Sequence, residues 1–283
     1  MKRALVSVSL LVGTATLALG GLSAVVAVAA PSAPAGDAPA VPTLAGLVEK
    51  EIKWGMSPAE VTNVYNRTGG LFDTEYAPQI AQLQPGVQMQ ALEAERDSRK
   101  ANFERSVTKL LGDTPTGYDV TPIHLEYTYK NNEAVQRVFK DGKNRYFFYI
   151  RDRLWKVYDE IPLREGGKLG KSYQDAVTKL NSVLGAGGRV RAANPAQNLE
   201  RTEVDWQDRS SHLRAVDRSS DHVCGLVLED RNTLANLSSL RSNKATDPFQ
   251  LDPSIAAITK RGISDPNAAH GGGADAGTGK GKK

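Results

Sequence analysis

The 283-residue chain has one cysteine, four histidines and few aromatic residues, which make up 6% of the sequence. A single cysteine excludes an internal disulfide, so the folded part must be stabilised by its core. Cys224 lies in the apolar stretch 223–228 and is expected to be a buried small hydrophobic residue, not a nucleophile. The sequence lacks the HExxH zinc motif, the GxSxG nucleophile motif, the Gly-Lys-Ser/Thr phosphate loop and the EF-hand loop. We therefore predict no catalytic residues, no metal site and no cofactor.

The first 30 residues predict export. Met1-Lys2-Arg3 is followed by a run of apolar or small residues that extends to Ala30. A short cationic start, a hydrophobic run and small residues at its end are typical of a secretory signal peptide, here residues 1–29. The alternative is an uncleaved inner-membrane anchor, because about 20 apolar residues can span a bilayer. We expect a periplasmic or extracellular protein.

Segments of low complexity flank the predicted folded part. Residues 30–46 are rich in Pro and Ala and predict an extended linker. A short C-terminal helix is predicted within 246–266, beginning at Asp252-Pro253, and a disordered Gly/Lys tail over 267–283. Five of the 36 basic residues and one of the 32 acidic residues lie in the first three residues and in this tail, which leaves 31 of each sign elsewhere. This neutral body argues against a nucleic-acid partner, whereas the basic tail predicts weak electrostatic tethering to an anionic envelope polymer.

Two predicted helix starts share a pattern at a separation of 115 residues. Trp54–Glu60 and Leu169–Asp175 each contain an apolar residue, Gly, one residue, Ser, two residues and an acid. Ser followed three residues later by an acid forms a capping box, which satisfies free amides in the first helical turn. Each start continues at helical spacing, and Gly69-Gly70 and Gly185 are expected to end the two helices.

Strand-like sequence follows each predicted helix. His124–Tyr129 parallels Arg201–Trp206 at a separation of 77 residues. Asp141-Gly142, between two apolar runs, is the strongest hairpin signal in the chain. The difference between the two separations places an insertion of about 38 residues in the first copy, including a charged helical stretch over residues 85–112.

These features predict an α+β protein of two similar modules. Each module is expected to be a capped helix packed on a three- to four-stranded antiparallel meander. The first module covers residues 47–163 with its long helical insertion, and the second covers residues 164–245. The weak internal repeat on which this division depends extends over both modules.

The first module resembles a known family. Gly55–Val61 reads Gly-Met-Ser-Pro-Ala-Glu-Val, and Tyr127-Thr128-Tyr129 and the hairpin Val138–Lys143 follow it. This order is similar to that of the outer-membrane assembly lipoproteins SmpA/BamE and of the tandem-repeat β-lactamase inhibitory proteins that share their fold. The resemblance implies an α+β fold and an envelope location. The chain lacks the lipid-anchor cysteine and the cysteine pairs of those proteins, and no binding residue is transferred from them.

The aromatic stretch 146–150 predicts a strand with apolar side chains on both faces. Alternation places Tyr146, Phe148 and Ile150 on one face, together with Phe139 of the facing strand. The inserted helix, the second module or a partner must cover this face. Cover from within the chain is favoured, because an exposed patch of this size promotes aggregation. The alternative is that these four residues bind a partner protein.

Two function classes follow. The missing catalytic motifs favour a non-catalytic interaction or scaffold protein of the bacterial envelope, which binds an unidentified envelope protein through a sheet face or edge. The alternative is an envelope hydrolase with an unrecognised active site, for which Glu126 and Glu203 form the best carboxylate pair. His212 and His222 are expected on opposite faces of a second hairpin, where they cannot share a metal ion.

Overall fold

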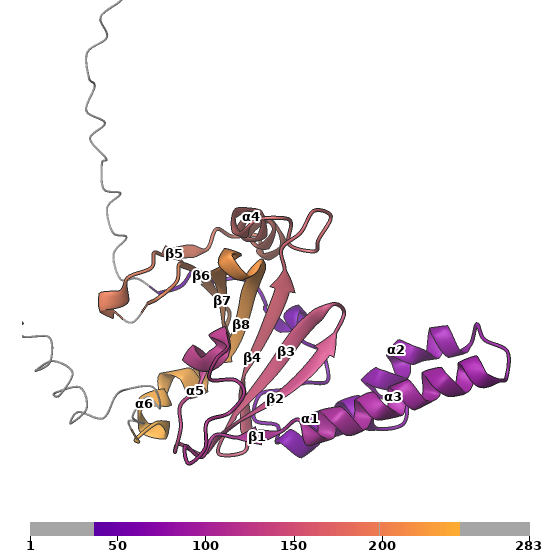
Figure 1. Cartoon of the computed structure of the whole chain (residues 1–283). Helices are drawn as coiled ribbons and strands as arrows, with labels where there is room; N and C mark the ends of the chain where they lie inside the picture. The colour runs from indigo at the N-terminus through magenta and orange to yellow at the C-terminus, as the bar shows by residue number, and fades with distance from the viewer. Residues whose placement is uncertain (1–36, 198, 244–283) are drawn as a thin grey trace, which may run out of the picture. The chain divides into compact units, whose positions relative to one another are not determined.

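A computed structural model of the chain describes residues 37–197 and 199–243 (Figure 1). The predicted signal peptide (1–29), C-terminal helix (246–266) and tail (267–283) lie outside these residues. In the described part, no helix has both the length and the apolar character needed to cross a membrane.

The strands form one antiparallel sheet. They are β1 (Thr108–Lys109), β2 (Glu133–Lys140), β3 (Lys143–Ile150), β4 (Arg153–Pro162), β5 (Arg189–Arg191), β6 (Glu203–Gln207), β7 (Ser211–Arg218) and β8 (Val223–Asp230). Their order in the eight-stranded sheet is β1-β2-β3-β4-β8-β7-β6-β5. Two runs of neighbouring strands therefore meet where β4 pairs with β8. The mixed helix and sheet content agrees with the predicted α+β class, and the division into two modules stays a prediction.

The helices lie mostly between these strands along the chain. They are α1 (Pro58–Asn66), α2 (Leu71–Ile80), α3 (Val87–Arg105), α4 (Tyr173–Leu184), α5 (Arg231–Ala235) and α6 (Leu237–Leu240), with 3-10 helices η1 (Ala45–Leu47), η2 (Pro122–Glu126), η3 (Pro195–Gln197) and η4 (Ser219–Asp221). Both predicted capping boxes are confirmed: Ser57 caps α1 and Ser172 caps α4, each accepting a hydrogen bond from the third residue of its helix. Gly185 ends α4 with a φ of 71°, in the left-handed region that favours glycine.

Two predicted elements differ from the structure. The charged stretch 85–112 contains α3, as expected, but an additional helix that was not predicted, α2, precedes it directly after Gly69-Gly70. These two helices form a hairpin that extends away from the sheet (Figure 1). His124–Tyr129, predicted as a strand, begins inside η2, because Pro122 fixes the first turn of a helix at this point.

The two central hairpins differ in how well the sequence predicted them. The first has the expected register, with Ala134 opposite Tyr149 across the Asp141-Gly142 turn. The second turn is longer than expected because η4 forms it. His212 lies on β7 opposite Glu229, whereas His222 follows η4 with a φ of 56°, so its predicted strand position is wrong.

The described part of the predicted linker packs on the sheet, contrary to the prediction of an extended linker over residues 30–46. Ala40 forms a parallel bridge with Gln207 of β6, and the side chain of Leu44 is 1% exposed. Apolar side chains in this Pro- and Ala-rich stretch thus join the core. We call residues 38–54 the strap.

The strap, α1 and α4 cover one face of the sheet, which we call the helix face. Tyr65 of α1 packs against Phe147 of β3, and their ring centroids lie 6.0 Å apart. Leu180 of α4 belongs to the same buried cluster as Trp206 of β6. Val48 of the strap contacts the clusters under both helices and so fills the space between them.

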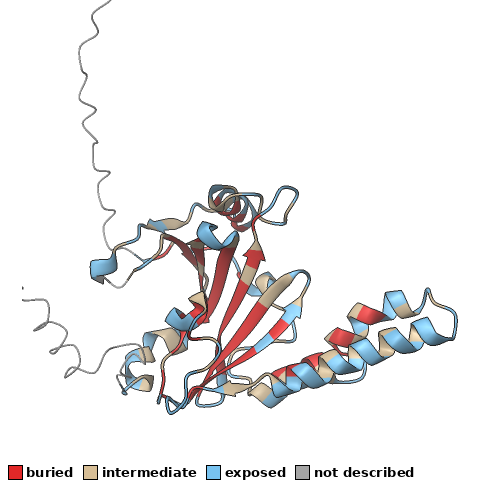
Figure 2. Ribbon diagram, in the orientation of Figure 1, coloured by how far each residue is buried: buried red, intermediate tan, exposed pale blue. Residues whose placement is uncertain are grey.

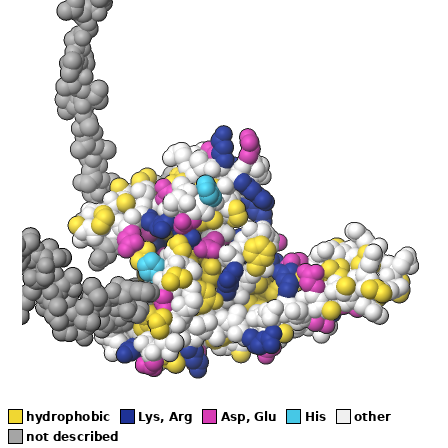
Figure 3. Space-filling model, in the orientation of Figure 1, with side chains coloured by type: hydrophobic (Ala, Val, Ile, Leu, Met, Phe, Trp, Pro, Cys, Tyr) yellow, Lys and Arg dark blue, Asp and Glu magenta, His cyan; other side chains and the backbone are white. Residues whose placement is uncertain are grey.

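The opposite face, the loop face, is covered by the segment 110–129 and by α5 and α6. Ile123 of η2 lies in one buried cluster with Phe148 and Trp155, and Leu237 of α6 packs against it. The central strands are consequently almost entirely buried, whereas α3 is mainly exposed (Figure 2). Acidic and basic side chains are intermixed on the visible surface of the sheet region (Figure 3).

Candidate functional site

The four aromatic and aliphatic residues predicted to bind a partner do not form one surface. Tyr146, Phe148 and Ile150 are at most 4% exposed and lie together in the core of the loop face. Phe139 is 60% exposed near the hairpin tip. The segment that follows the inserted helices provides the cover, together with α6. Phe139 is therefore the one predicted residue that a partner reaches without opening the core.

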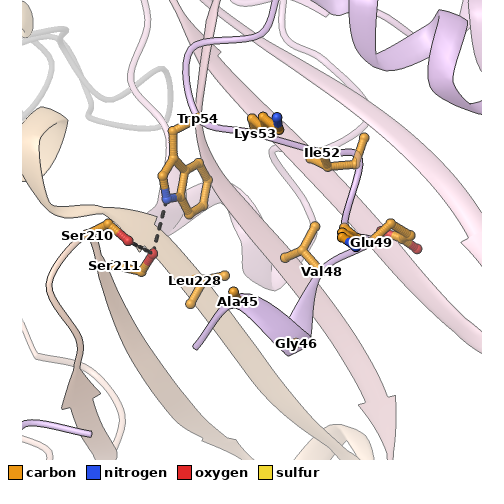
Figure 4. A pocket seen from close by; sticks show the side chains of 11 residues that line it. Ala45, Gly46, Val48, Glu49, Ile52, Lys53, Trp54, Ser210, Ser211 and Leu228 are labelled. Atoms are coloured by element: carbon orange, nitrogen blue, oxygen red, sulfur yellow. Dashed lines mark hydrogen bonds between the residues drawn. The ribbon is translucent and has the colours of Figure 1, made fainter. Parts of the chain in front are cut away.

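An apolar groove lies on the helix face between the strap and the middle of the sheet (Figure 4). Its volume is about 680 Å³, which falls within the range of small-molecule and peptide-anchor pockets. Leu228 of β8 lies at one side, and Val48, Ile52 and Trp54 of the strap line the other. These three strap side chains are only half-buried, so the groove is open to solvent.

Specific hydrogen bonds fix the strap beside the groove. The Trp54 Nε1–H donates to Ser211 Oγ at 3.1 Å, which ties the indole to the start of β7 (Figure 4). Gly55 follows with a φ of 85°, and its N–H donates to the Leu154 carbonyl at 2.8 Å. At the other end, Arg145 donates to the Leu47 carbonyl at 3.1 Å. The groove is thus a pre-formed part of the fold.

The rim of the groove is cationic. Lys50 and Lys53 line it, are exposed, and form no ion pair with any described residue. Glu49 also lines the groove, but it pairs with Arg145 and, at 3.5 Å, with Lys140. Two ammonium groups without an ion-pair partner among the described residues therefore stand beside apolar walls.

A second polar feature, a buried charge cluster, lies on the loop face around Arg214. Its guanidinium group contacts Glu203 at 2.6 Å, Glu126 at 2.8 Å and Glu229 at 3.1 Å. Lys156 contacts Glu126 at 2.7 Å. Burial acts to raise the pKa of Glu126 and of Glu229, but the charges of Arg214 and Lys156 outweigh it and hold both values below the ordinary range. Glu126 and Glu229 are therefore ionised at neutral pH.

The carboxylate pair predicted for a hydrolase meets in this cluster. Glu126 and Glu203 come from η2 and β6, and both accept hydrogen bonds from Arg214. An ionised carboxylate held by a guanidinium group is a poor proton donor. The geometry therefore favours charge compensation over acid–base chemistry at these two residues.

His212 links the charge cluster to the next carboxylate along the sheet. Its ring nitrogens lie 3.1 Å from Glu229 Oε2 and 3.3 Å from Asp205 Oδ2. Burial and the nearby charge of Arg214 act to lower the pKa of His212, but hydrogen bonds to the two carboxylates raise it above its ordinary value. The Arg189 guanidinium group also contacts the Asp205 carboxylate, at 2.5 Å.

We expect His212→Gln to cost more stability in acid than in base. A histidine whose folded pKa is raised contributes stability that is complete below its unfolded pKa of about 6.5 and is lost as the pH rises through the folded pKa. The variant should lose more unfolding free energy at pH 5.5 than at pH 9, by roughly 1 kcal/mol or more, as measured by urea unfolding. Gln207→Ala, opposite His212 on β6, changes no titrating group and serves as the control. An equal loss at both pH values would contradict the ion-paired state.

The remaining groups with possible reactivity are the Cys224 thiol and side chains that could bind a metal ion. Cys224 is fully buried, as predicted, and burial raises the pKa of its thiol to about 12. Within residues 37–197 and 199–243, no group of three or more His, Cys, Asp or Glu side chains is placed to hold a metal ion.

Sequence reasoning missed both the groove and the charge cluster. The apolar residues Val41 and Leu44, within a stretch assigned to a linker, were the available signal for the strap. Comparisons of the chain with protein-family models, curated proteins and solved structures found no significant match. The function is therefore argued from the geometry of the molecule.

Proposed function

We propose that the chain is an exported, non-catalytic interaction protein of the cell envelope that binds an extended apolar segment of a partner protein on the helix face of its sheet. The observation that carries this proposal is the groove, which has a volume of about 680 Å³. Half-buried Val48, Ile52 and Trp54 line it together with Leu228. Sites that bind ligands are generally pre-formed hollows with apolar walls and a few polar groups.

The charge of the rim indicates the chemistry of the partner. Lys50 and Lys53 form no ion pair with a described residue, so a bound segment gains most if Asp or Glu stands beside its apolar side chains. We therefore propose an acidic, apolar segment as the occupant. Two exposed ammonium groups affect the association rate and the choice of partner more than the total binding free energy.

Export and the two-module organisation belong to the same proposal. The cationic start and apolar run of residues 1–30 support export. Capping boxes at Ser57 and Ser172, each followed by strands of an antiparallel run, support two similar modules of the SmpA/BamE kind. We do not propose the hydrolase, because Glu126 and Glu203 are both engaged by Arg214.

Peptide selection tests the proposed function. We expect peptides selected from a random library on the purified protein to share apolar residues next to Asp or Glu. Replacement of both Lys50 and Lys53 by Glu should weaken the binding of a selected peptide, made synthetically, by about tenfold or more, because the reversed charges repel its acidic residues. The affinity is measured by fluorescence of Trp54, the tryptophan that lines the groove.

A matched pair of lysines provides the control. Lys168 and Lys171 are also exposed and three residues apart, but they precede α4 and do not line the groove. Their replacement by Glu should leave the affinity unchanged. Selected peptides that bind equally well to the Lys50/Lys53 variant and to a folded Ile52→Asp variant would overturn the proposal.

A further inference from the structure

A second cavity, separate from the groove, lies on the loop face between η2, α6 and the strands β4, β8 and β7. Its volume is about 220 Å³. Trp155 and Arg214 line it from the sheet, Leu125 and Leu237 line it from the covering segments, and Arg201 and Arg218 line it near the start of β6 and the end of β7. This space is too small for a peptide segment and large enough for a small molecule or several waters.

The hydrogen-bonding groups of this cavity are unequally satisfied. The carboxylates that line it, Glu126, Glu203 and Glu229, already accept hydrogen bonds from Arg or Lys side chains. By contrast, the Trp155 Nε1–H is buried and has no hydrogen-bond partner among the described residues. A buried donor without an acceptor is destabilising, so a donor left in this state beside a cavity points to a ligand with acceptor atoms.

Arg201 is the second donor group that lacks an acceptor. Its guanidinium group forms no hydrogen bond with a described residue, and its one ion pair, with Asp221, is long at 3.6 Å. Arg218 uses the same carboxylate at 3.0 Å. The Asp217 N–H donates to the Thr202 carbonyl, which places Arg201, just before β6, beside Arg218 at the end of β7. Arg218 also pairs with Glu160 at 2.6 Å and donates to the Tyr158 hydroxyl at 2.8 Å, so Arg201 is the arginine of this pair with unused donors.

We propose that this cavity binds a small oxyanion, a carboxylate or a phosphate group, through Arg201 and the Trp155 indole, beside the guanidinium group of Arg218. The donors without acceptors select an anion, because such a ligand brings several acceptor atoms and no donor. Arg presents paired N–H groups that match the geometry of both anions. Lys156 and Arg241 lie over the Trp155 ring at 4.4 and 5.2 Å, so two further cations stand beside the indole.

Indole resonances of the ¹⁵N-labelled protein test this site. The three tryptophans give three indole N–H signals, and Trp155→Phe identifies the one at the cavity. Titration with inorganic phosphate, or separately with acetate, should shift the Trp155 signal saturably, while chloride at equal ionic strength should not. The two titrations distinguish a phosphate from a carboxylate site. Movement of all three signals together, or of none beyond the chloride control, would overturn the proposal.

Two arginine variants separate binding from a general effect of charge. Arg201→Gln should weaken binding of the anion that shifts the Trp155 signal by about tenfold or more, because it removes the guanidinium group with unused donors. Arg209→Gln, in the exposed turn before β7, removes the same charge outside the cavity and should leave the titration unchanged. If Arg201→Gln leaves the titration unchanged, the shift of the Trp155 signal is caused by another group, and the proposed anion site is refuted. Failure here leaves the groove on the other face untouched.

Discussion

Phe148→Ala should lower the free energy of unfolding by about 3–5 kcal/mol, as removal of a buried aromatic side chain does when the cavity cannot collapse. Phe148 has no exposed area and lies in a cluster closed by Ile123 of η2. On the sheet it is flanked by Val135 and Lys156, and the Lys156 ammonium lies 5.4 Å from its ring. Urea unfolding at neutral pH, followed by circular dichroism, measures the loss.

Phe139→Ala is the matched control for this prediction. Phe139 is on the neighbouring strand and was assigned to the same face, yet it is 60% exposed. Its truncation should change the unfolding free energy by no more than about 0.5 kcal/mol. If Phe148→Ala were equally mild, the loop face would be open, and Tyr146, Phe148 and Ile150 would again be candidates for a partner surface.

Local sequence signals predicted the parts of the fold that depend on neighbouring residues. Asp141-Gly142 determined the first hairpin and its register, because that dipeptide favours a turn whose twist matches the strands. Ser57 and Ser172 marked two helix starts through hydrogen bonds made within four residues. Such interactions are visible in a single sequence because both partners lie within one turn.

The remaining features depend on contacts that are distant in the chain. Val41 and Leu44 belong to the core only because α4 and β6 to β8 lie beside them, and a Pro- and Ala-rich composition conceals this. The pairing of β4 with β8 joins residues about 70 positions apart, with Tyr158 opposite Val227. Composition and periodicity give no information on such pairings.

The charge cluster was concealed for a different reason. A charged residue on a strand normally faces water, so Arg214 and Glu229 had no special significance in the sequence. Glu126 was paired with Glu203 because both were assigned to equivalent strands. Glu126 instead lies on η2, and the two meet because the covering segment places Glu126 over the sheet.

Arg214→Met should be among the most destabilising substitutions in the chain, with a loss of about 3–5 kcal/mol at pH 7. Arg214 contacts Glu126, Glu203 and Glu229 together, so its loss leaves these carboxylates buried with too little positive charge. The number of apolar atoms at the position is nearly kept, so lost packing contributes little. Chemical denaturation of both proteins over a range of pH values measures the difference.

The pH dependence separates this electrostatic effect from packing. Carboxylates whose folded pKa is lowered, such as Glu126 and Glu229, contribute stability above their unfolded pKa of about 4.3 and lose it as the pH falls through the folded value. The difference in unfolding free energy between wild type and Arg214→Met should therefore become smaller below about pH 4. Arg191→Gln removes a partly exposed partner of Glu203 and should cost no more than about 1 kcal/mol. A gap that is equal at pH 3 and pH 7 would mean that Arg214 acts by filling space, and the buried cluster would then not stabilise the ionised state of its carboxylates.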